Sequence, residues 1–176
     1  MIAISIVNIP GFARVVRAQV LSARELEYVK AARSIGCSGT HVLFNEVAPI
    51  ARTLGMRLSF TAEGSAVVDL PYNPALDHGA GGIHGGVYAV VMDSAGWFTS
   101  AAAHDEDTWI ATGELSIHFL QPVERRALRA VGRLIKKGRR QDVAEVHLYD
   151  ETGRLVGHAT GTFVLVPGTA LQPPSF

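Results

Sequence analysis

The stretch GGIHGGVYAVVMDSAG, residues 81–96, decides the fold. It places four glycines and a histidine in front of an apolar run that holds a single acid, Asp93. Apolar side chains between Val87 and Ala103 point in nearly every direction around a helix, which predicts that this helix is buried. Burial removes water from a carboxylate and raises its pKa. Asp93 is therefore a candidate for chemistry, with a capping hydrogen bond to nearby backbone as the alternative.

Strand-like alternation begins after about residue 50. Glycine-containing turns, GRRQ and ETG, separate the last three segments and are typical of hairpins. We therefore expect an α+β fold in which an antiparallel meander packs around one central helix. The predicted strands are MRLSF (56–60), AVVDL (66–70), ELSIHFL (114–120), ALRAVGRLIKK (127–137), DVAEVHLYD (142–150) and RLVGHATGTFVLV (154–166).

Residues 1–49 carry a helical pattern instead. We treat them as an appendage to a domain formed by residues 50–176. A capping-box pattern and helix-breaking residues set the limits of the helices. The predicted helices are Gly11–Leu21, a second one opened by Ser22–Glu25 and ended by Gly36, and a third over Thr40–Ala48 that stops at Pro49.

The 176 residues are 48% hydrophobic and carry no formal net charge, which suits one domain with a sizeable core. Zero net charge gives no general attraction to nucleic acid or anionic lipid, so neither partner is expected. Cys37 is the sole cysteine, which excludes an internal disulfide and fits a structural thiol and a cytoplasmic location. The apolar start reaches only to Pro10, where a membrane span needs about 20 residues, so no membrane segment is expected.

The glycine-rich motif also carries a family resemblance. NPALDHGAGGIHGGVYAVVMDSAG at 73–96, followed by TGELSIHFLQPV at 112–123, resembles the hotdog acyl-CoA thioesterases, above all the phenylacetate-pathway and hydroxybenzoyl-CoA groups. The likeness runs from about residue 49 to residue 166. It implies a hotdog fold and hydrolysis of an acyl-CoA thioester or a simpler ester. It also implies no cofactor besides the coenzyme A of the substrate, and a homodimer or dimer of dimers with sites at the interface.

The resemblance assigns roles to residues by their place in the motif. The N–H of Gly85, the first glycine of His-Gly-Gly, polarises the thioester carbonyl. Asp93 acts as general base on water or as nucleophile. Thr112, counted back from Pro122, orients the attacking water.

Two histidines near the helix start leave alternatives open. His78 stands where the family has Asn or Gln, a departure that leaves its role undecided. His84 and Gly86 flank the donor glycine and are candidate substrate contacts. A hotdog dehydratase for hydroxyacyl thioesters would need a histidine paired with the acid, so His78 or His84 keeps that activity as an alternative. The two histidines lack a third ligand at a recognised spacing, so no metal site is expected.

The groups that hydrolysis requires can be assigned to residues of this helix without the resemblance. A helix N-terminus supplies a hydrogen-bond donor where negative charge grows on oxygen, and an acid supplies the base for water. Gly85 and Asp93 are eight residues apart, so they stand about 12 Å apart along one helix. Each must lie about 3 Å from the reacting atoms. The working pair therefore has to come from two chains of a dimer whose interface covers the carboxylate.

The spacing of residues around this stretch excludes two other catalytic or cofactor-binding motifs. A dinucleotide fingerprint that starts at Gly79 needs a glycine at position 84, and no βαβ pattern surrounds it. A serine-hydrolase elbow around Ser94 needs a glycine at position 92, where Met92 stands. The remaining histidines of the domain are expected to be ordinary sheet or surface residues: His104, His118, His147 and His158.

Four positive charges gather at the predicted hairpin tip KKGRR, on Lys136, Lys137, Arg139 and Arg140. One interpretation is a soluble turn that discourages edge pairing of strands. The other is a grip on the phosphates of coenzyme A, as similar hairpins provide in the hotdog family. Nucleic acid would need a wider basic face with stacking aromatics, which the sequence lacks.

The first segment resembles a second family. Residues of about 10–49, above all EYVKAARSIGCSGTHVLFNEVAPI at 27–50, are similar to the cytoplasmic loop of ABC-transporter permeases. In that family the loop docks on the ATPase subunit, which gives a non-catalytic docking protein as an alternative function. We find no membrane helices that would give such docking a purpose. The matching positions are Ala31, Ala32, Gly36 and Pro49, and the departures are Lys30, Glu46 and Ala48.

Overall fold

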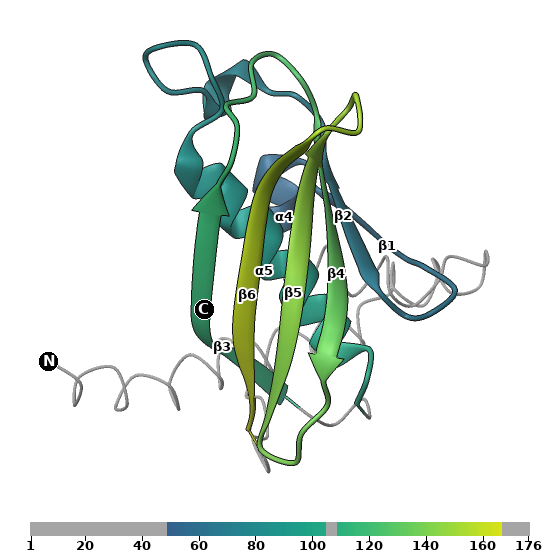
Figure 1. Ribbon diagram of the computed structural model, residues 1–176. Coiled ribbons are helices and arrows are strands. Elements are labelled where there is room, and N and C mark those ends of the chain that lie inside the picture. The colour runs from purple at the N-terminus through teal and green to yellow at the C-terminus, as the bar shows by residue number, and fades with distance from the viewer. Residues whose placement is uncertain (1–48, 105–108, 167–176) are drawn as a thin grey trace, which may run out of the picture.

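Residues 49–104 and 109–166 are described by the structure, a computed structural model. They form two α-helices, one short 3-10 helix and six strands (Figure 1). The elements are α4 (Pro49–Leu54), β1 (Arg57–Phe60), β2 (Ala66–Leu70), η1 (Pro74–Leu76), α5 (Gly85–Ala101), β3 (Trp109–Phe119), β4 (Leu128–Lys136), β5 (Gln141–Asp150) and β6 (Leu155–Val166).

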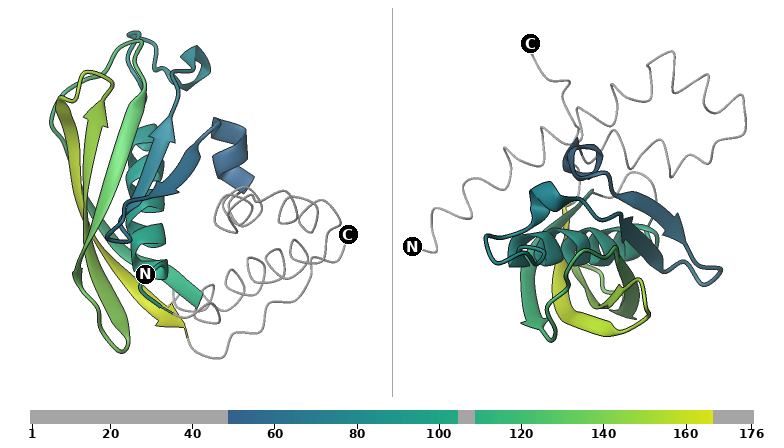
Figure 2. Two further views of the ribbon diagram at one scale, coloured as in Figure 1. Left: turned by 90° about the vertical axis from the view of Figure 1, so that its right-hand side faces the viewer. Right: turned by 90° about the horizontal axis from the view of Figure 1, so that it is seen from above.

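One antiparallel sheet holds all six described strands, in the order β1-β2-β4-β5-β6-β3. Its inner face curves around α5, which runs along the sheet as a single long helix (Figures 1 and 2). This helix contacts every strand from β2 to β6. The α+β hotdog fold predicted from the sequence is confirmed, with β3 at one edge of the sheet and β1 at the other.

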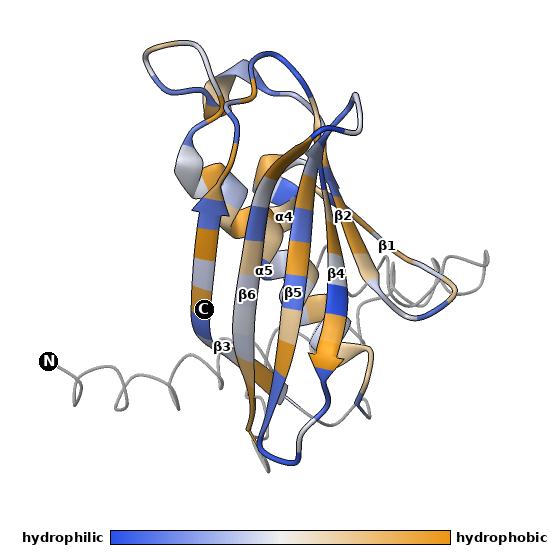
Figure 3. Ribbon diagram, in the orientation of Figure 1, coloured by the Kyte–Doolittle hydropathy of each residue, from blue (hydrophilic) through white to orange (hydrophobic). Residues whose placement is uncertain are grey.

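Alternating apolar and polar side chains decide which face of each strand is buried, and the alternation is visible along β4 to β6 (Figure 3). In β5 the side chains of Ala144, Val146 and Leu148 are fully buried, and the residues between them are half-buried. Val91 and Met92 of α5 belong to the same cluster of buried side chains as Val146 and Leu148. The core therefore lies between α5 and the inner face of the sheet.

The predicted strands agree with the observed ones within a few residues, except at β3. This strand begins at Trp109 instead of Glu114, because its first residues pair with the end of β6. The register shifts between Thr112 and Glu114, where Gly113 stands. A glycine inside a strand weakens the sequence signal and often marks such a bulge, which explains why the first half of β3 was missed.

The central helix differs in two respects from the prediction. It spans Gly85–Ala101, two residues earlier than the predicted Val87–Ala103. The prediction that it is buried on all sides is wrong for the single chain, since Val87 and Val90 are only half-buried. The sheet covers one side of α5 and leaves these valines partly exposed.

The short helix α4 contradicts the predicted end of helical structure at Pro49. Residues Pro49–Leu54 are helical, with Pro49 in the first turn of the described helix. Proline is well suited to a first turn, because its missing N–H would have no intrahelical partner there. The predicted helices in residues 1–48 lie outside the described residues.

Gly132 on β4 allows α5 to approach the sheet closely. A Cβ atom at this position would lie 2.6 Å from the carbonyl oxygen of Ala95 and closer still to the Thr99 hydroxyl. Because the helix backbone would have to shift, Gly132→Ala should lower the free energy of unfolding by about 1–3 kcal/mol in denaturant titrations. Gly79→Ala is the control, since a Cβ there meets no heavy atom within 4 Å. Equal stability of the two variants would contradict the prediction.

Candidate active site

The start of α5 is capped by the side chain of His84. The backbone of this residue is extended, with φ −62° and ψ 136°, and its Nδ1 accepts a hydrogen bond from the Gly86 N–H at 2.9 Å. Glycine suits position 86, because a Cβ there would lie only 3.1 Å from this nitrogen. His84 thus satisfies one of the N–H groups that the start of a helix leaves without an intrahelical acceptor.

The N–H of Gly85 is the donor that remains at this helix start. Among residues 49–104 and 109–166, no hydrogen-bond acceptor contacts it. Phe119 of β3 lies beside it, with ring carbons 3.5 and 3.7 Å from where a Gly85 Cβ would be. Phe119 is 58% exposed and packs edge-on against the buried ring of Tyr88. An unpaired N–H at the positive end of a helix dipole, beside aromatic surface, suits the oxygen of a ligand that carries an apolar group.

Asp93 lies about two turns further along the same helix and is half-buried. Thr112 of β3 donates a hydrogen bond from Oγ1 to Asp93 Oδ1 at 2.8 Å. Burial raises the pKa of Asp93 above its ordinary range, and the bond from Thr112 lowers this pKa in part. The other carboxylate oxygen, Oδ2, accepts no hydrogen bond from any described residue. A carboxylate with a raised pKa and a free oxygen is suited to act as a base.

Both groups face the edge strand β3, Gly85 through Phe119 and Asp93 through Thr112. Their separation along the helix axis is about 12 Å, which is too far for both to act on one carbonyl group. Strand β3 pairs with β6 on one side, and no described strand pairs with its other side. The donor and the acid therefore lie along an unpaired sheet edge without meeting.

His78 lies in the loop before α5 and is exposed. Its Nδ1 accepts a hydrogen bond from the Ala80 N–H at 3.1 Å. A neutral ring in this arrangement carries its proton on Nε2 and presents an N–H, as the side chain of asparagine would. His84 has the same arrangement. Neither ring is hydrogen-bonded to Asp93 in the described part of the chain, so the histidine–acid pair of the dehydratase alternative does not form within one chain.

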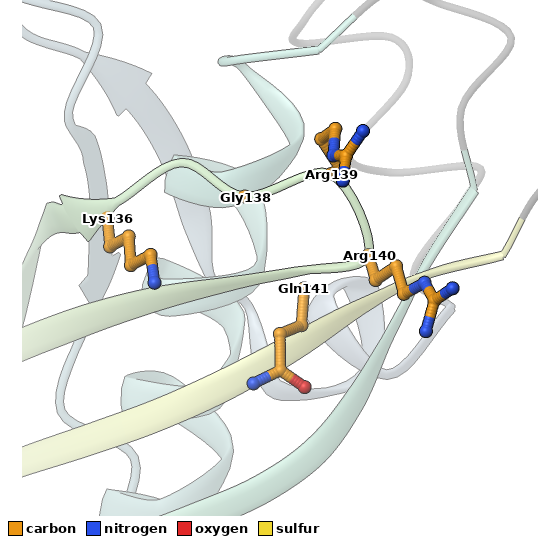
Figure 4. A pocket seen from close by; sticks show the side chains of 5 residues that line it. All are labelled: Lys136, Gly138, Arg139, Arg140 and Gln141. Carbon is orange, nitrogen blue, oxygen red and sulfur yellow. The ribbon is translucent and has the colours of Figure 1, made fainter.

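The basic hairpin lies near the C-terminal end of α5, and the helix starts at the opposite end (Figure 1). It borders an open hollow of about 490 Å³ that is lined by Lys136, Gly138, Arg139, Arg140 and Gln141. Figure 4 shows the side chains of Lys136, Arg139 and Arg140 pointing in different directions. Lys137 is exposed and does not line the hollow. The four charges share one turn, but the side chains of Lys136, Arg139 and Arg140 do not converge on one point.

A hydrogen-bond network at the same end of α5 was missed by the sequence analysis. The fully buried Asp142 accepts hydrogen bonds at Oδ2 from the Ser100 hydroxyl and from His104 Nε2, the latter at 2.7 Å. The prediction that His104 is an ordinary sheet or surface residue is therefore wrong. The strand pattern contained a signal, because Asp142 falls on the inward-facing positions of β5, and a buried acid needs hydrogen-bond partners.

The three other predicted sheet histidines do lie on strands. His118 is paired in register with His158, and His158 with His147, so the three occupy neighbouring positions on β3, β6 and β5. In residues 49–104 and 109–166, no group of three or more His, Cys, Asp or Glu side chains is arranged to hold a metal ion. The structure thus brings Asp93 and Thr112 together.

Residues 80–157, which include the start of α5, Asp93 and Thr112, match the family described as the Thioesterase superfamily. This part of the chain is similar to that superfamily. The resemblance to hotdog thioesterases that the motif carries is confirmed at this level. The catalytic roles of Asp93, Gly85, His78 and Thr112 remain predictions.

Individual proteins are similar to this chain in sequence or in fold. A Saccharolobus solfataricus protein, provisionally named an esterase, is 27% identical over 124 residues, which are 70% of this chain and 88% of that protein. A thioesterase-family protein from Silicibacter pomeroyi has a solved structure with 28% identity and a TM-score of 0.65, covering 68% of this chain and 90% of that one. The PaaI protein of the E. coli phenylacetic acid degradation operon is similar in fold, with a TM-score of 0.66 at 21% identity, over 74% and 92% of the two chains.

The permease resemblance is also confirmed. Residues 1–70 match the family described as the binding-protein-dependent transport system inner membrane component. A dipeptide transport permease of Alkalihalophilus pseudofirmus is 43% identical over 49 residues, which are 28% of this chain and only 16% of that protein. The family match overlaps α4, β1 and β2, of which β1 and β2 are part of the hotdog sheet. No helix of the described residues is long and apolar enough to span a membrane.

Proposed function

We propose that this protein hydrolyses acyl-CoA thioesters to a free acid and coenzyme A, and that it also accepts simpler esters. The observation that supports this most directly is the unpaired Gly85 N–H at the start of α5, on a helix that also carries Asp93. The two groups supply a donor for the carbonyl oxygen and a base for water, which is what acyl transfer to water needs. Coenzyme A enters as part of the substrate, and the proposal requires no cofactor.

The proposed reaction uses the contacts around these groups. The thioester oxygen accepts a hydrogen bond from the Gly85 N–H, and the helix dipole stabilises the negative charge that develops there. Asp93 removes a proton from a water molecule oriented by the Thr112 hydroxyl, and the water oxygen attacks the carbonyl carbon. The tetrahedral intermediate then expels coenzyme A as a thiolate, which takes up the proton. Direct attack by Asp93, followed by hydrolysis of the anhydride, uses the same residues.

The separation of about 12 Å between donor and acid requires two chains in this proposal. The unpaired edge of β3 and the half-buried Val87 and Val90 of α5 support a contact with a second copy on this side. A two-fold axis would then bring Gly85 of each protomer towards Asp93 of the other and create two equal sites. A homodimer suffices for this arrangement, and a dimer of dimers repeats it.

The remaining candidate residues take supporting roles. His78 and His84 offer Nε2–H groups to the substrate. The Gly86 N–H already donates to His84, so Gly86 offers no donor and instead allows the substrate to approach the backbone closely. The basic hairpin holds the phosphates of coenzyme A through Lys136, Lys137, Arg139 and Arg140.

A panel of acyl-CoA thioesters and simple esters, assayed by detection of the free thiol or acid, tests the proposal. Turnover by the purified protein alone is the expected result. Failure to hydrolyse any member of the panel, together with capture of a transporter ATPase in a pulldown, would favour the docking alternative instead. That alternative draws support from the permease match of residues 1–70.

The pH dependence of hydrolysis should report on Asp93. The base works when it is ionised, so kcat/KM should fall as the pH drops through the raised pKa of Asp93. Thr112→Val removes the hydrogen bond that lowers this pKa, so the acidic limb of the profile should move to higher pH. Thr112→Ser keeps the hydroxyl and should leave the limb in place. An acidic limb that is the same in the valine variant and the wild type would count against Asp93 as the base.

A further inference from the structure

The basic hairpin between β4 and β5 carries charge that no described residue pairs with. Its four cationic residues, Lys136, Lys137, Arg139 and Arg140, are all exposed. Within residues 49–104 and 109–166, none of them forms an ion pair. No acidic side chain of the described residues lines the hollow of about 490 Å³ beside them. Among the described residues, no acidic side chain competes with a ligand for the positive charge of the hairpin.

The backbone of this hairpin is held from inside by Asp142. Oδ1 of this carboxylate accepts a hydrogen bond from the Gly138 N–H at the tip, at 2.9 Å. Only glycine fits at position 138, because a Cβ there would overlap the carbonyl oxygen of Gln141. On the other limb of the turn, the carbonyl oxygen of Arg140 accepts a hydrogen bond from the Leu165 N–H at 2.9 Å. The turn that carries the charges thus has defined anchors on both limbs.

The second oxygen of the same carboxylate ties the hairpin to α5. Oδ2 accepts hydrogen bonds from the Ser100 hydroxyl and from His104 Nε2, at the C-terminal end of the helix. Asp142 and Ser100 are both fully buried, so solvent does not compete for these contacts. A single carboxylate with three donors therefore connects the hairpin tip to the central helix.

We propose that Asp142 is a positioning residue for binding the nucleotide part of coenzyme A. This inference rests on the proposed function, because it takes the ligand of the hairpin to be the coenzyme A half of the substrate. Asp142 is buried and does not touch the ligand. It holds the Gly138 turn in one conformation, so that less conformational entropy is lost when phosphates bind to the flanking cations.

The chemistry of coenzyme A fits the splayed side chains of the hairpin. Its nucleotide carries a 3′-phosphate and a separate 5′-diphosphate, which are anionic groups at different points of one molecule. Arg139 and Arg140 point in different directions in Figure 4, and each guanidinium can bind one phosphate through two hydrogen bonds. Divergent cations therefore suit a ligand with two separate phosphate groups better than a single phosphate.

The test compares two substrates that carry the same acyl group, one on coenzyme A and one on pantetheine, which lacks the nucleotide. For Asp142→Asn we expect KM for acyl-CoA to rise about tenfold, with kcat and KM for acyl-pantetheine unchanged. Ser100→Ala removes one anchor of the carboxylate and should change the KM for acyl-CoA in the same direction by a smaller factor. Isothermal calorimetry with adenosine 3′,5′-bisphosphate should show weaker binding to both variants.

Asp150→Asn is the matched control, because Asp150 is also a buried carboxylate of β5 but lies at the far end of the strand from the hairpin. In this control, the ratio of KM for acyl-CoA to KM for acyl-pantetheine should stay as in the wild type. Equal changes in both KM values for Asp142→Asn and Ser100→Ala, or no change in either, would overturn the inference. If Asp142→Asn does not fold, Ser100→Ala decides alone.

A wild-type protein that hydrolyses neither substrate would refute the proposed function, and calorimetry would then decide the inference. Bisphosphate binding that Asp142→Asn or Ser100→Ala weakens would uphold it. Absence of binding to the wild type would overturn it.

Discussion

Asp93→Asn should lower kcat for acyl-CoA hydrolysis by about 10² to 10⁴ without loss of the fold. Asparagine keeps the shape of the side chain and can still accept the hydrogen bond from Thr112, but it cannot take a proton from water. Replacing a half-buried charge by a neutral amide also removes a desolvation cost, so the melting temperature should not fall. Initial rates at saturating substrate measure kcat, and a thermal melt followed by circular dichroism measures the melting temperature.

Asp69→Asn is the matched control for this substitution. Asp69 lies on β2, where it forms an ion pair with Arg129, and it has no part in the proposed chemistry. Its kcat should equal that of the wild type. If Asp93→Asn keeps more than half of its activity while His78→Ala abolishes turnover, the base is a histidine and the assignment of Asp93 is wrong.

A mixture of Asp93→Asn and Gly85→Pro proteins should recover about a quarter of wild-type activity, although each variant alone is nearly inactive. The first variant lacks the base and the second lacks the donor N–H. In a mixed dimer one site carries both lesions and the other carries neither. Random exchange of protomers makes half of the dimers mixed, and half of their sites are intact. Steady-state rates before and after mixing measure the recovery.

The structure indicates that Gly85→Pro is compatible with the fold. Gly85 is the first residue of α5, where proline is common because no intrahelical bond uses the N–H. His84 before it has ψ 136°, the extended conformation that a residue before proline prefers. A Cβ at Gly85 would make an ordinary contact with Phe119, at 3.5 Å. Circular dichroism of the separate variants checks that both fold.

Gly85→Ala is the control for the proline variant, since it adds a side chain but keeps the N–H. It should retain far more activity than Gly85→Pro. Given folded protomers that exchange, as shown by a mixed dimer in native mass spectrometry, a rate no higher than that of the separate variants would place each site within one chain. The two-chain mechanism would then have to be abandoned.

Local patterns were sufficient to predict most of the sheet. The strand AVVDL at 66–70 has the observed limits of β2, because alternation and the flanking turns are encoded within a few residues. Motif spacing singled out Asp93 and Thr112 independently, and the structure joins them by a hydrogen bond. The glycines of His-Gly-Gly were correctly placed at the start of the helix, although its limits were shifted by two residues.

Contacts between distant parts of the chain were not predictable in the same way. Ser100 and Asp142 are 42 residues apart. The periodicity of apolar residues within a short segment does not show that a helix end and a distant hairpin will be in contact. Periodicity shows that a helix is apolar but not how much of it one chain covers, and Asp93 is half-buried in the single chain. Only about half of the long edge strand β3 was predicted, because Gly113 interrupts the alternation of apolar and polar residues on which the prediction depends.

The eleven residues of β3 also link stability to protein concentration. They leave one row of backbone N–H and C=O groups unpaired by any described strand. Pairing of this row with a second copy is a bimolecular reaction, so by mass action the free energy of unfolding should increase with the amount of protein present. If the proposed dimer forms, dilution should release a monomer whose bare edge is a template for non-native strands. The sheet edge that the proposed two-chain site requires is thus also where aggregation of dilute or damaged protein would begin.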